Sequence, residues 1–153
     1  MDKSLFDERD IFVHQTFHSR DDFYDFVTAH LLDENKIKPD YRASIIQREK
    51  NFPTGLNTGA IKVAIPHTDY TRSNTTQIIV TTLAQPIKFH QMDCPERTID
   101  VSIILLILFD KPQKQLAILQ QMMEIVQNQQ TLNALLVQKD KQSIIKILES
   151  IGG

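Results

Sequence analysis

One nearly continuous apolar segment constrains the fold of this 153-residue chain more than any other feature. It reads VSIILLILF and covers residues 101–109. A membrane-spanning helix needs about 20 apolar residues, so this segment is about half the required length. A strand that is apolar on both faces is usually central in its sheet and covered by helices on both sides. We therefore predict a buried central strand over residues 98–109.

The rest of the chain alternates between strand and helix patterns. Alternating or β-branched segments predict strands at residues 11–17, 62–65 and 77–83, with a short one at 87–89. Helical spacing predicts a helix over residues 20–35 capped by Ser19, a second that opens at Pro39 and Asp40 and ends before Pro53, and three more after Pro112. With the short segment 87–89 not counted separately, the predicted order is β-α-α-β-β-β-α-α-α. We therefore expect an α/β fold, a three-layer α/β/α sandwich with a mixed sheet, as a single domain over residues 1–153.

Composition argues against several classes of function. Lys and Arg number 17 against 19 Asp and Glu, so the net charge of −2 gives little electrostatic reason to bind nucleic acid or an anionic membrane. Cys94 is the only cysteine, which rules out an intrachain disulfide and a cysteine-based zinc site. The acidic N-terminus has no apolar segment typical of a signal peptide, so a cytoplasmic location is expected. No nucleotide-binding motif such as GxGxxG or a P-loop is found, and we expect no direct use of ATP.

Four of the five histidines give weak signals. His14 and His18 have a spacing that would suit a metal on a helix, but they fall on a predicted strand and its exit, so solvated positions are the favoured interpretation. His30 follows the first helical pattern as a boundary residue. His90 follows a short strand and has no partner in the sequence. We accordingly predict no metal ion and no cofactor.

His67 differs because it directly follows a predicted strand, in the segment VAIPHTD. Strand ends are where sites form in open α/β sheets. Pro66 lacks a backbone donor and so ends the strand pairing, while Thr68 and Asp69 supply a hydroxyl and a carboxylate nearby. A hydrogen-bonded neighbour can fix which imidazole nitrogen is free to react. A turn histidine without a role is the alternative.

A possible anion site precedes it in the segment REKNFPTG, at the end of the second predicted helix. The Arg48 guanidinium has planar donors that match phosphate oxygens, and Thr54 lies in the following turn with hydroxyl and backbone donors. A solvated helix C-terminus would also favour an arginine, because its charge suits the helix dipole. From the local pattern alone, the solvated interpretation is preferred.

Taken together, REKNFPTG and VAIPHTD resemble the enzyme IIA domains of the fructose–mannitol class in the bacterial phosphoenolpyruvate-dependent sugar phosphotransferase system, and most closely the galactitol type. The resemblance covers nearly the whole chain. It implies that His67 receives a phosphoryl group from HPr and passes it to a IIB component. It also implies that Arg48 is the active-site arginine, with Thr54 in the turn beside it and Thr68 as support.

One position departs from the family pattern. Several domains of this class have a second histidine near the start of the helix after the long strand, where this chain has Gln115. An amide can donate a hydrogen bond but cannot titrate, so a mechanism with two ionising imidazoles is not expected here. Galactitol-type members also lack that histidine.

Two other functions remain open besides a sugar-transport carrier. A regulatory IIA-like module would keep His67 and signal its phosphorylation state to another protein. A metal-binding or degenerate scaffold would use His67 with Asp69, although only these two candidate ligands cluster. The sugar itself cannot be inferred, because a IIA domain contacts proteins and a phosphoryl group rather than the sugar.

Overall fold

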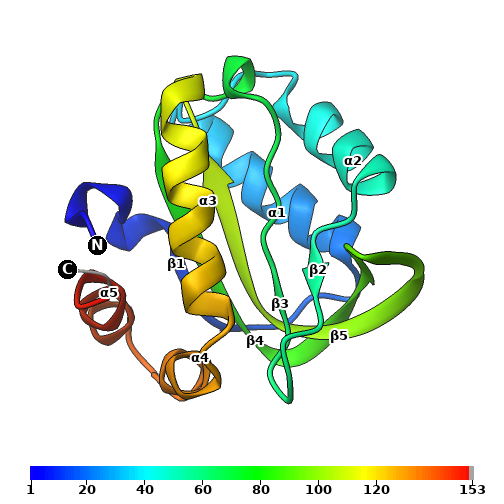
Figure 1. Cartoon of the computed structure of the whole chain (residues 1–153). Helices are drawn as coiled ribbons and strands as arrows, with labels where there is room; N and C mark the ends of the chain where they lie inside the picture. Colours follow the sequence, from blue (N-terminus) through cyan, green and yellow to red (C-terminus); the bar gives the residue numbers. More distant parts are fainter. Residues whose placement is uncertain (152–153) are drawn as a thin grey trace.

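The computed structural model describes residues 1–151, which form a five-stranded mixed sheet between two layers of helices (Figure 1). The strand order is β1-β4-β2-β3-β5, and β4 also pairs directly with β5. The strands are β1 (Ile11–Gln15), β2 (Gly55–Leu56), β3 (Val63–Ala64), β4 (Gln77–Gln91) and β5 (Cys94–Leu108). The predicted fold class is confirmed.

Helices cover both faces of the sheet, α1 and α2 on one side and α3, α4 and α5 on the other (Figure 1). They are α1 (Arg20–Asp33), α2 (Tyr41–Asn51), α3 (Pro112–Val126), α4 (Gln129–Leu136) and α5 (Lys141–Glu149). Three short 3-10 helices add Lys3–Leu5, Glu8–Asp10 and Tyr70–Arg72. Among residues 1–151, no helix combines the length and the apolar character that crossing a membrane requires.

The apolar strand β5 separates two hydrophobic cores. Ile103, Leu105 and Ile107 belong to the core under α3, α4 and α5. Ile104 and Leu106 point the other way, into the core under α1 and α2. Side chains alternate between the two faces of a strand, so a strand covered on both sides must be apolar at every position. This explains why residues 101–109 are apolar at nearly every position.

Local signals set most helix boundaries. The Ser19 hydroxyl caps α1 by accepting a hydrogen bond from the Asp22 amide at 3.2 Å. α1 ends two residues before the predicted boundary, because Asn35 has a left-handed backbone (φ 58°) that a helix cannot contain. Pro112 is the first residue of α3, where its missing amide hydrogen is not needed.

Three features of the sheet differ from the prediction. The long strand β5 begins at Cys94, four residues before the predicted start, because it pairs with β4 up to the hairpin tip. The segments 77–83 and 87–89 are one strand, β4, which continues through a register shift between Thr82 and Ile87. The two-residue strand β2 was not predicted. It pairs with β3 and, at Gly55, with the far end of β4 at Gln91. The β4–β5 hairpin therefore returns toward β2, and its tip lies beside the end of α2 (Figure 1).

Candidate functional site

His67 lies just beyond β3, and a hydrogen bond fixes its ring. Its Nδ1 is 2.9 Å from the carbonyl oxygen of Ile65. A carbonyl can only accept, so Nδ1 carries the proton and donates it. The lone pair of the neutral ring is then on Nε2. The strand end therefore presents one defined nucleophilic nitrogen.

The surroundings of His67 favour the neutral ring. Its ring meets the Phe109 ring edge-on, with the centroids 6.3 Å apart. Burial lowers the pKa of His67; the hydrogen bond to the Ile65 carbonyl opposes this effect, and the positive charge of Arg48 adds to it. The pKa lies below its ordinary value, so the imidazole is mostly unprotonated near pH 7 and can act as a nucleophile.

A pocket of about 360 Å³ brings His67 together with two of the other predicted residues. It is lined by Arg48, Asn51, Phe52, Pro53, Thr54, His67, Met92 and Pro95. These residues come from the end of α2, the turn after it, the loop after β3 and the tip of the β4–β5 hairpin. The three motif residues Arg48, Thr54 and His67 therefore share one pocket, together with Met92 and Pro95 from the hairpin tip.

Arg48 is exposed on the last turn of α2, and its guanidinium lies 4.5 Å from the centroid of the Phe52 ring. Within residues 1–151, no carboxylate is close enough to form an ion pair with it. Stacking on an aromatic ring limits the motion of the guanidinium without using its hydrogen-bond donors. Its donors thus remain available to an anion in the pocket.

Thr54 is held by Glu49, a residue that the sequence did not single out. Glu49 is 1% exposed, and its carboxylate accepts hydrogen bonds from the Thr54 amide at 2.8 Å and the Thr54 hydroxyl at 2.7 Å. The Tyr24 hydroxyl of α1 donates a third bond at 2.7 Å. Burial and the negative charge of Glu49 raise the pKa of Tyr24, so it stays protonated and keeps donating. The turn beside His67 is thereby anchored to two helices.

Thr68 and Asp69 do not line the pocket. Thr68 is 6% exposed, and its hydroxyl is 2.6 Å from that of Ser44 on α2. This contact joins the loop after β3 to α2, so Thr68 can support the position of His67 without lining the pocket. Asp69 caps the helix Tyr70–Arg72 by accepting from the Thr71 amide at 3.0 Å. Its carboxylate is thus engaged locally, which leaves little support for a metal site made of His67 and Asp69.

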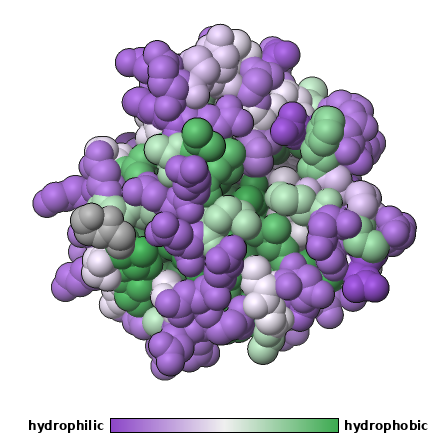
Figure 2. Space-filling view, in the orientation of Figure 1, coloured by the Kyte–Doolittle hydropathy of each residue, from purple (hydrophilic) through white to green (hydrophobic). Residues whose placement is uncertain are grey.

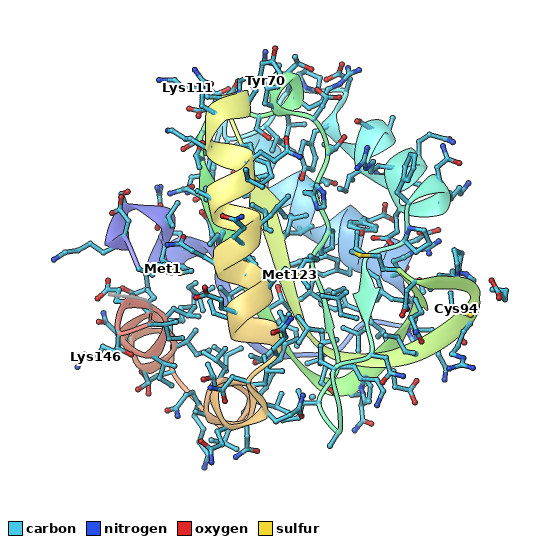
Figure 3. All side chains as sticks on the ribbon, viewed as in Figure 1. Met1, Tyr70, Cys94, Lys111, Met123 and Lys146 are labelled. Carbon is cyan, nitrogen blue, oxygen red and sulfur yellow. The ribbon has the colours of Figure 1, made fainter. Side chains whose placement is uncertain are left out.

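Gln115 lies on the first turn of α3 and is partly buried. The N-terminal end of α3, marked by Lys111, is at the same end of the molecule as Tyr70 (Figure 3). Gln115 is not among the residues that line the pocket, and the described part of the chain contains no hydrogen bond between it and His67. Its predicted hydrogen bond, to the imidazole or to the bound phosphoryl group, remains a prediction.

The remaining histidines lie outside this pocket. His14 contacts the Leu136 carbonyl through Nε2 at 2.8 Å, and His90 contacts the Pro95 carbonyl through Nδ1 at 2.8 Å. His18 is exposed. His30 is different, because it lies between the carboxylates of Asp10 and Glu34 at the C-terminal end of α1.

The sequence of this chain matches one protein family and a group of curated relatives. The family described as "Phosphoenolpyruvate-dependent sugar phosphotransferase system, EIIA 2" matches residues 4–151. The galactitol-specific EIIA component of Escherichia coli K12 is 24% identical over 104 residues, which cover 68% of this chain and 69% of that protein.

Solved structures share the fold. The complex of enzyme IIA mannitol with phosphorylated enzyme IIB mannitol from Escherichia coli matches with a TM-score of 0.76 and 14% identity, covering 94% of this chain and 96% of that one. The nitrogen regulatory protein IIA-Ntr from Neisseria meningitidis matches with a TM-score of 0.75 and 18% identity, covering 95% and 97%. At these identities, the likeness concerns the fold alone.

Proposed function

The chain belongs to the EIIA 2 family of the phosphoenolpyruvate-dependent sugar phosphotransferase system, and on that premise we propose that it carries a phosphoryl group on Nε2 of His67. The observation that carries this proposal is the hydrogen bond from Nδ1 of His67 to the Ile65 carbonyl at 2.9 Å. It leaves Nε2 as the free nucleophile in a pocket that also contains Arg48.

The transfer step needs no proton acceptor on this chain. Nε2 attacks the phosphorus of the donor, the donor's bond to phosphorus breaks, and a bond between phosphorus and Nε2 forms. The proton on Nδ1 stays in place, so the product ring is cationic, and the Ile65 carbonyl stabilises that cation. A cationic ring is a good leaving group, so the same hydrogen bond also favours onward transfer.

Arg48 in the pocket and the N-terminus of α3, which does not line the pocket, suit the oxygens of the transferred group. Phosphoryl transfer depends mostly on positioning and on stabilising the equatorial oxygens. The Arg48 guanidinium offers donors of matching geometry. The positive end of the α3 dipole, at Pro112, is a further candidate because helix N-termini favour anions.

We propose HPr as the donor and a IIB component as the acceptor, in the uptake of galactitol or a related hexitol. The similarity to a galactitol-specific EIIA component supports the sugar class. The fold shared with a IIA protein that forms a complex with phosphorylated IIB supports the acceptor. Within this proposal, the partner proteins select the sugar, because this chain only accepts and passes on the phosphoryl group.

A regulatory function is the second candidate, and the fold shared with a nitrogen regulatory IIA-Ntr protein favours it. The two functions differ in where the phosphoryl group goes. A transport carrier passes it to a IIB protein within its turnover, whereas a regulator keeps it and binds a target according to its phosphorylation state.

Phosphorylation in a reconstituted system tests the proposal. The chain is incubated with phosphoenolpyruvate, enzyme I and HPr, and its intact mass is measured. We expect one added phosphoryl group that is labile in acid and stable in alkali, and none in His67→Ala. His18→Ala is the matched control and should be phosphorylated normally. A phosphorylated His67→Ala would refute the proposal, and adding a galactitol-type IIB then distinguishes a carrier from a regulator.

A further inference from the structure

A cluster of potential metal ligands lies away from the pocket, where the N-terminal segment meets the C-terminal end of α1. Nε2 of His30 is 2.9 Å from Oδ1 of Asp10 and 3.0 Å from Oε1 of Glu34. All three atoms lie within 4.8 Å of one another. The phosphoryl chemistry of His67 does not use this cluster.

Hydrogen bonding inside the cluster is incomplete. The Asp10 side chain is 1% exposed and that of Glu34 is 10% exposed. The Oε1 atom of Glu34 is buried without a hydrogen-bond partner in the structure. One N–H of His30 can serve only one acceptor well, and it points to Asp10.

The cations of the cluster form no hydrogen bond with Oδ1 of Asp10 or Oε1 of Glu34. Lys36 contacts Asp10 through the other oxygen, Oδ2, and Asp7 at 2.9 Å. Its ammonium is 3.7 Å from Oε1 of Glu34, which is too far for a hydrogen bond. Arg9 approaches the other oxygen of Glu34 at 3.4 Å. Three carboxylates thus face two permanent cations, and the excess negative charge lies beside the ring of His30.

We propose that Asp10, His30 and Glu34 bind a divalent first-row transition cation, with Zn²⁺ as the probe. Histidine nitrogen and carboxylate oxygen bind Zn²⁺ at about 2.0–2.2 Å, so neighbouring ligand atoms around one ion lie about 3–3.5 Å apart. The two distances from Nε2 of His30 are close to that spacing. The His30 side chain is 31% exposed, which leaves room for water to complete the coordination.

Binding changes the protonation of His30. Its Nε2 lone pair goes to the ion, so the ring proton moves to Nδ1. The ion then joins Asp10, next to β1, to two residues at the end of α1 and clasps the N-terminal segment to that helix. This proposal departs from the sequence-based expectation of no metal ion.

Calorimetric titration of the full chain with Zn²⁺ tests the proposal. We expect one site, and at least tenfold weaker binding in His30→Gln and in Glu34→Gln, which keep the side-chain size. His18→Gln and His67→Ala are controls and should retain the site, because neither residue belongs to the cluster. Unchanged binding in both His30→Gln and Glu34→Gln, or loss of the site in His67→Ala, would overturn it.

A second variant separates a metal site from a purely structural ion-pair cluster. Lys36→Met removes the competing cation and frees Oδ2 of Asp10, so Zn²⁺ should bind more tightly and raise the melting temperature more than in the unmodified chain. The NMR signals of the His30 ring should shift on titration. If Zn²⁺ neither stabilises Lys36→Met nor shifts the His30 signals, the cluster is not a metal site.

Discussion

At the scale of single residues, His67 illustrates how one contact selects one reactive atom. The Ile65 carbonyl holds the proton of Nδ1, so in the proposed transfer the phosphoryl group can bond only to Nε2. The sequence could indicate that His67 ends a strand, but it could not indicate this tautomer. The contact joins residues only two positions apart and depends on the backbone direction that follows Pro66.

The pH dependence of phosphoryl acceptance should reflect the lowered pKa of His67. A protonated ring has no free lone pair, so acceptance falls as pH drops through this pKa. The pKa of an unperturbed histidine is about 6.5. Because burial lowers the pKa of His67, the rate should reach half of its maximum at a pH below 6.5. The measurement is the rate against pH after subtracting the donor's titration. A midpoint above the ordinary value would contradict it.

Arg48→Gln should slow transfer and leave the fold intact. Arg48 is exposed and pairs with no carboxylate in the described chain, so its loss costs little stability. Losing hydrogen bonds to a charged phosphoryl group costs about 1.5–3 kcal/mol, or roughly a ten- to hundredfold lower rate. Arg48→Lys, which keeps the charge without the planar donors, should recover only part of the rate. A large fall in melting temperature with normal transfer would make Arg48 structural.

Glu49→Gln should affect both stability and transfer. An amide has an NH2 group where the carboxylate has a second acceptor oxygen, and this NH2 group would face a donor of Thr54 or Tyr24. A buried polar group left unpaired costs about 1–3 kcal/mol. The turn at Thr54 should then move relative to His67. Tyr24→Phe is the control: it removes one donor, keeps both Thr54 bonds and should change the transfer rate less. Equal effects of the two variants on transfer would argue against positioning by Glu49.

At the scale of elements, the sequence predicted what local chemistry decides. The continuous apolar segment of β5, the cap at Ser19 and the proline at the start of α3 each appear within a few residues of the chain. The strand β2 has no such signal, because its two residues are held only by β3 and the end of β4. Gly55 fits there because an added Cβ would lie 2.6 Å from the His90 carbonyl oxygen.

In the candidate site, too, residues marked by a nearby pattern could be predicted, and residues placed by distant segments could not. The local pattern singles out His67 because it follows a predicted strand, whereas Arg48 is indicated only by the family resemblance, since a helix end alone favours a solvated arginine. Glu49 directly follows Arg48 near a helix end, where a charged residue usually faces solvent, yet α1 and the turn at Thr54 bury it. Met92 and Pro95 join the pocket only through the bend of the β4–β5 hairpin, which no local pattern reveals.

The start of α3 is the element whose part in transfer remains to be measured. If Gln115 donates one neutral hydrogen bond to the phosphoryl group in the transition state, its loss costs about 1–1.5 kcal/mol. Gln115→Ala should then transfer about tenfold more slowly. Gln115→His should stay active and add a second titration to the pH profile. An unchanged rate in Gln115→Ala, with both partners limiting and then saturating, would make Gln115 a surface residue of the first turn.

At the scale of the whole molecule, distant segments build an apolar rim around His67. Phe52, at the end of α2, is 59% exposed, and Met92, at the hairpin tip, is 40% exposed. The Met92 amide donates to the Gly55 carbonyl at 2.8 Å, which fixes the tip beside the pocket. Figure 2 shows how apolar residues interrupt the otherwise hydrophilic surface on the face drawn there. Exposed aromatic and methionine side chains favour contact with a partner protein, and such contact excludes water from the transfer.

Met92→Asp should therefore weaken partner docking rather than the chemical step. A charge placed in an apolar contact costs binding energy, and about 1.4 kcal/mol corresponds to a tenfold weaker interaction. We expect KM for HPr or for IIB to rise about tenfold, with the maximal rate and the melting temperature nearly unchanged, because the side chain is exposed and His67 keeps its bond to Ile65. The matched control is Val137→Asp, a comparable change at an exposed residue (56%) after α4 and outside the pocket. Rates measured over a range of partner concentrations separate the two parameters. A fall in the maximal rate at constant KM would assign Met92 to the chemistry instead, and equal effects in both variants would show that the rim is not a docking surface.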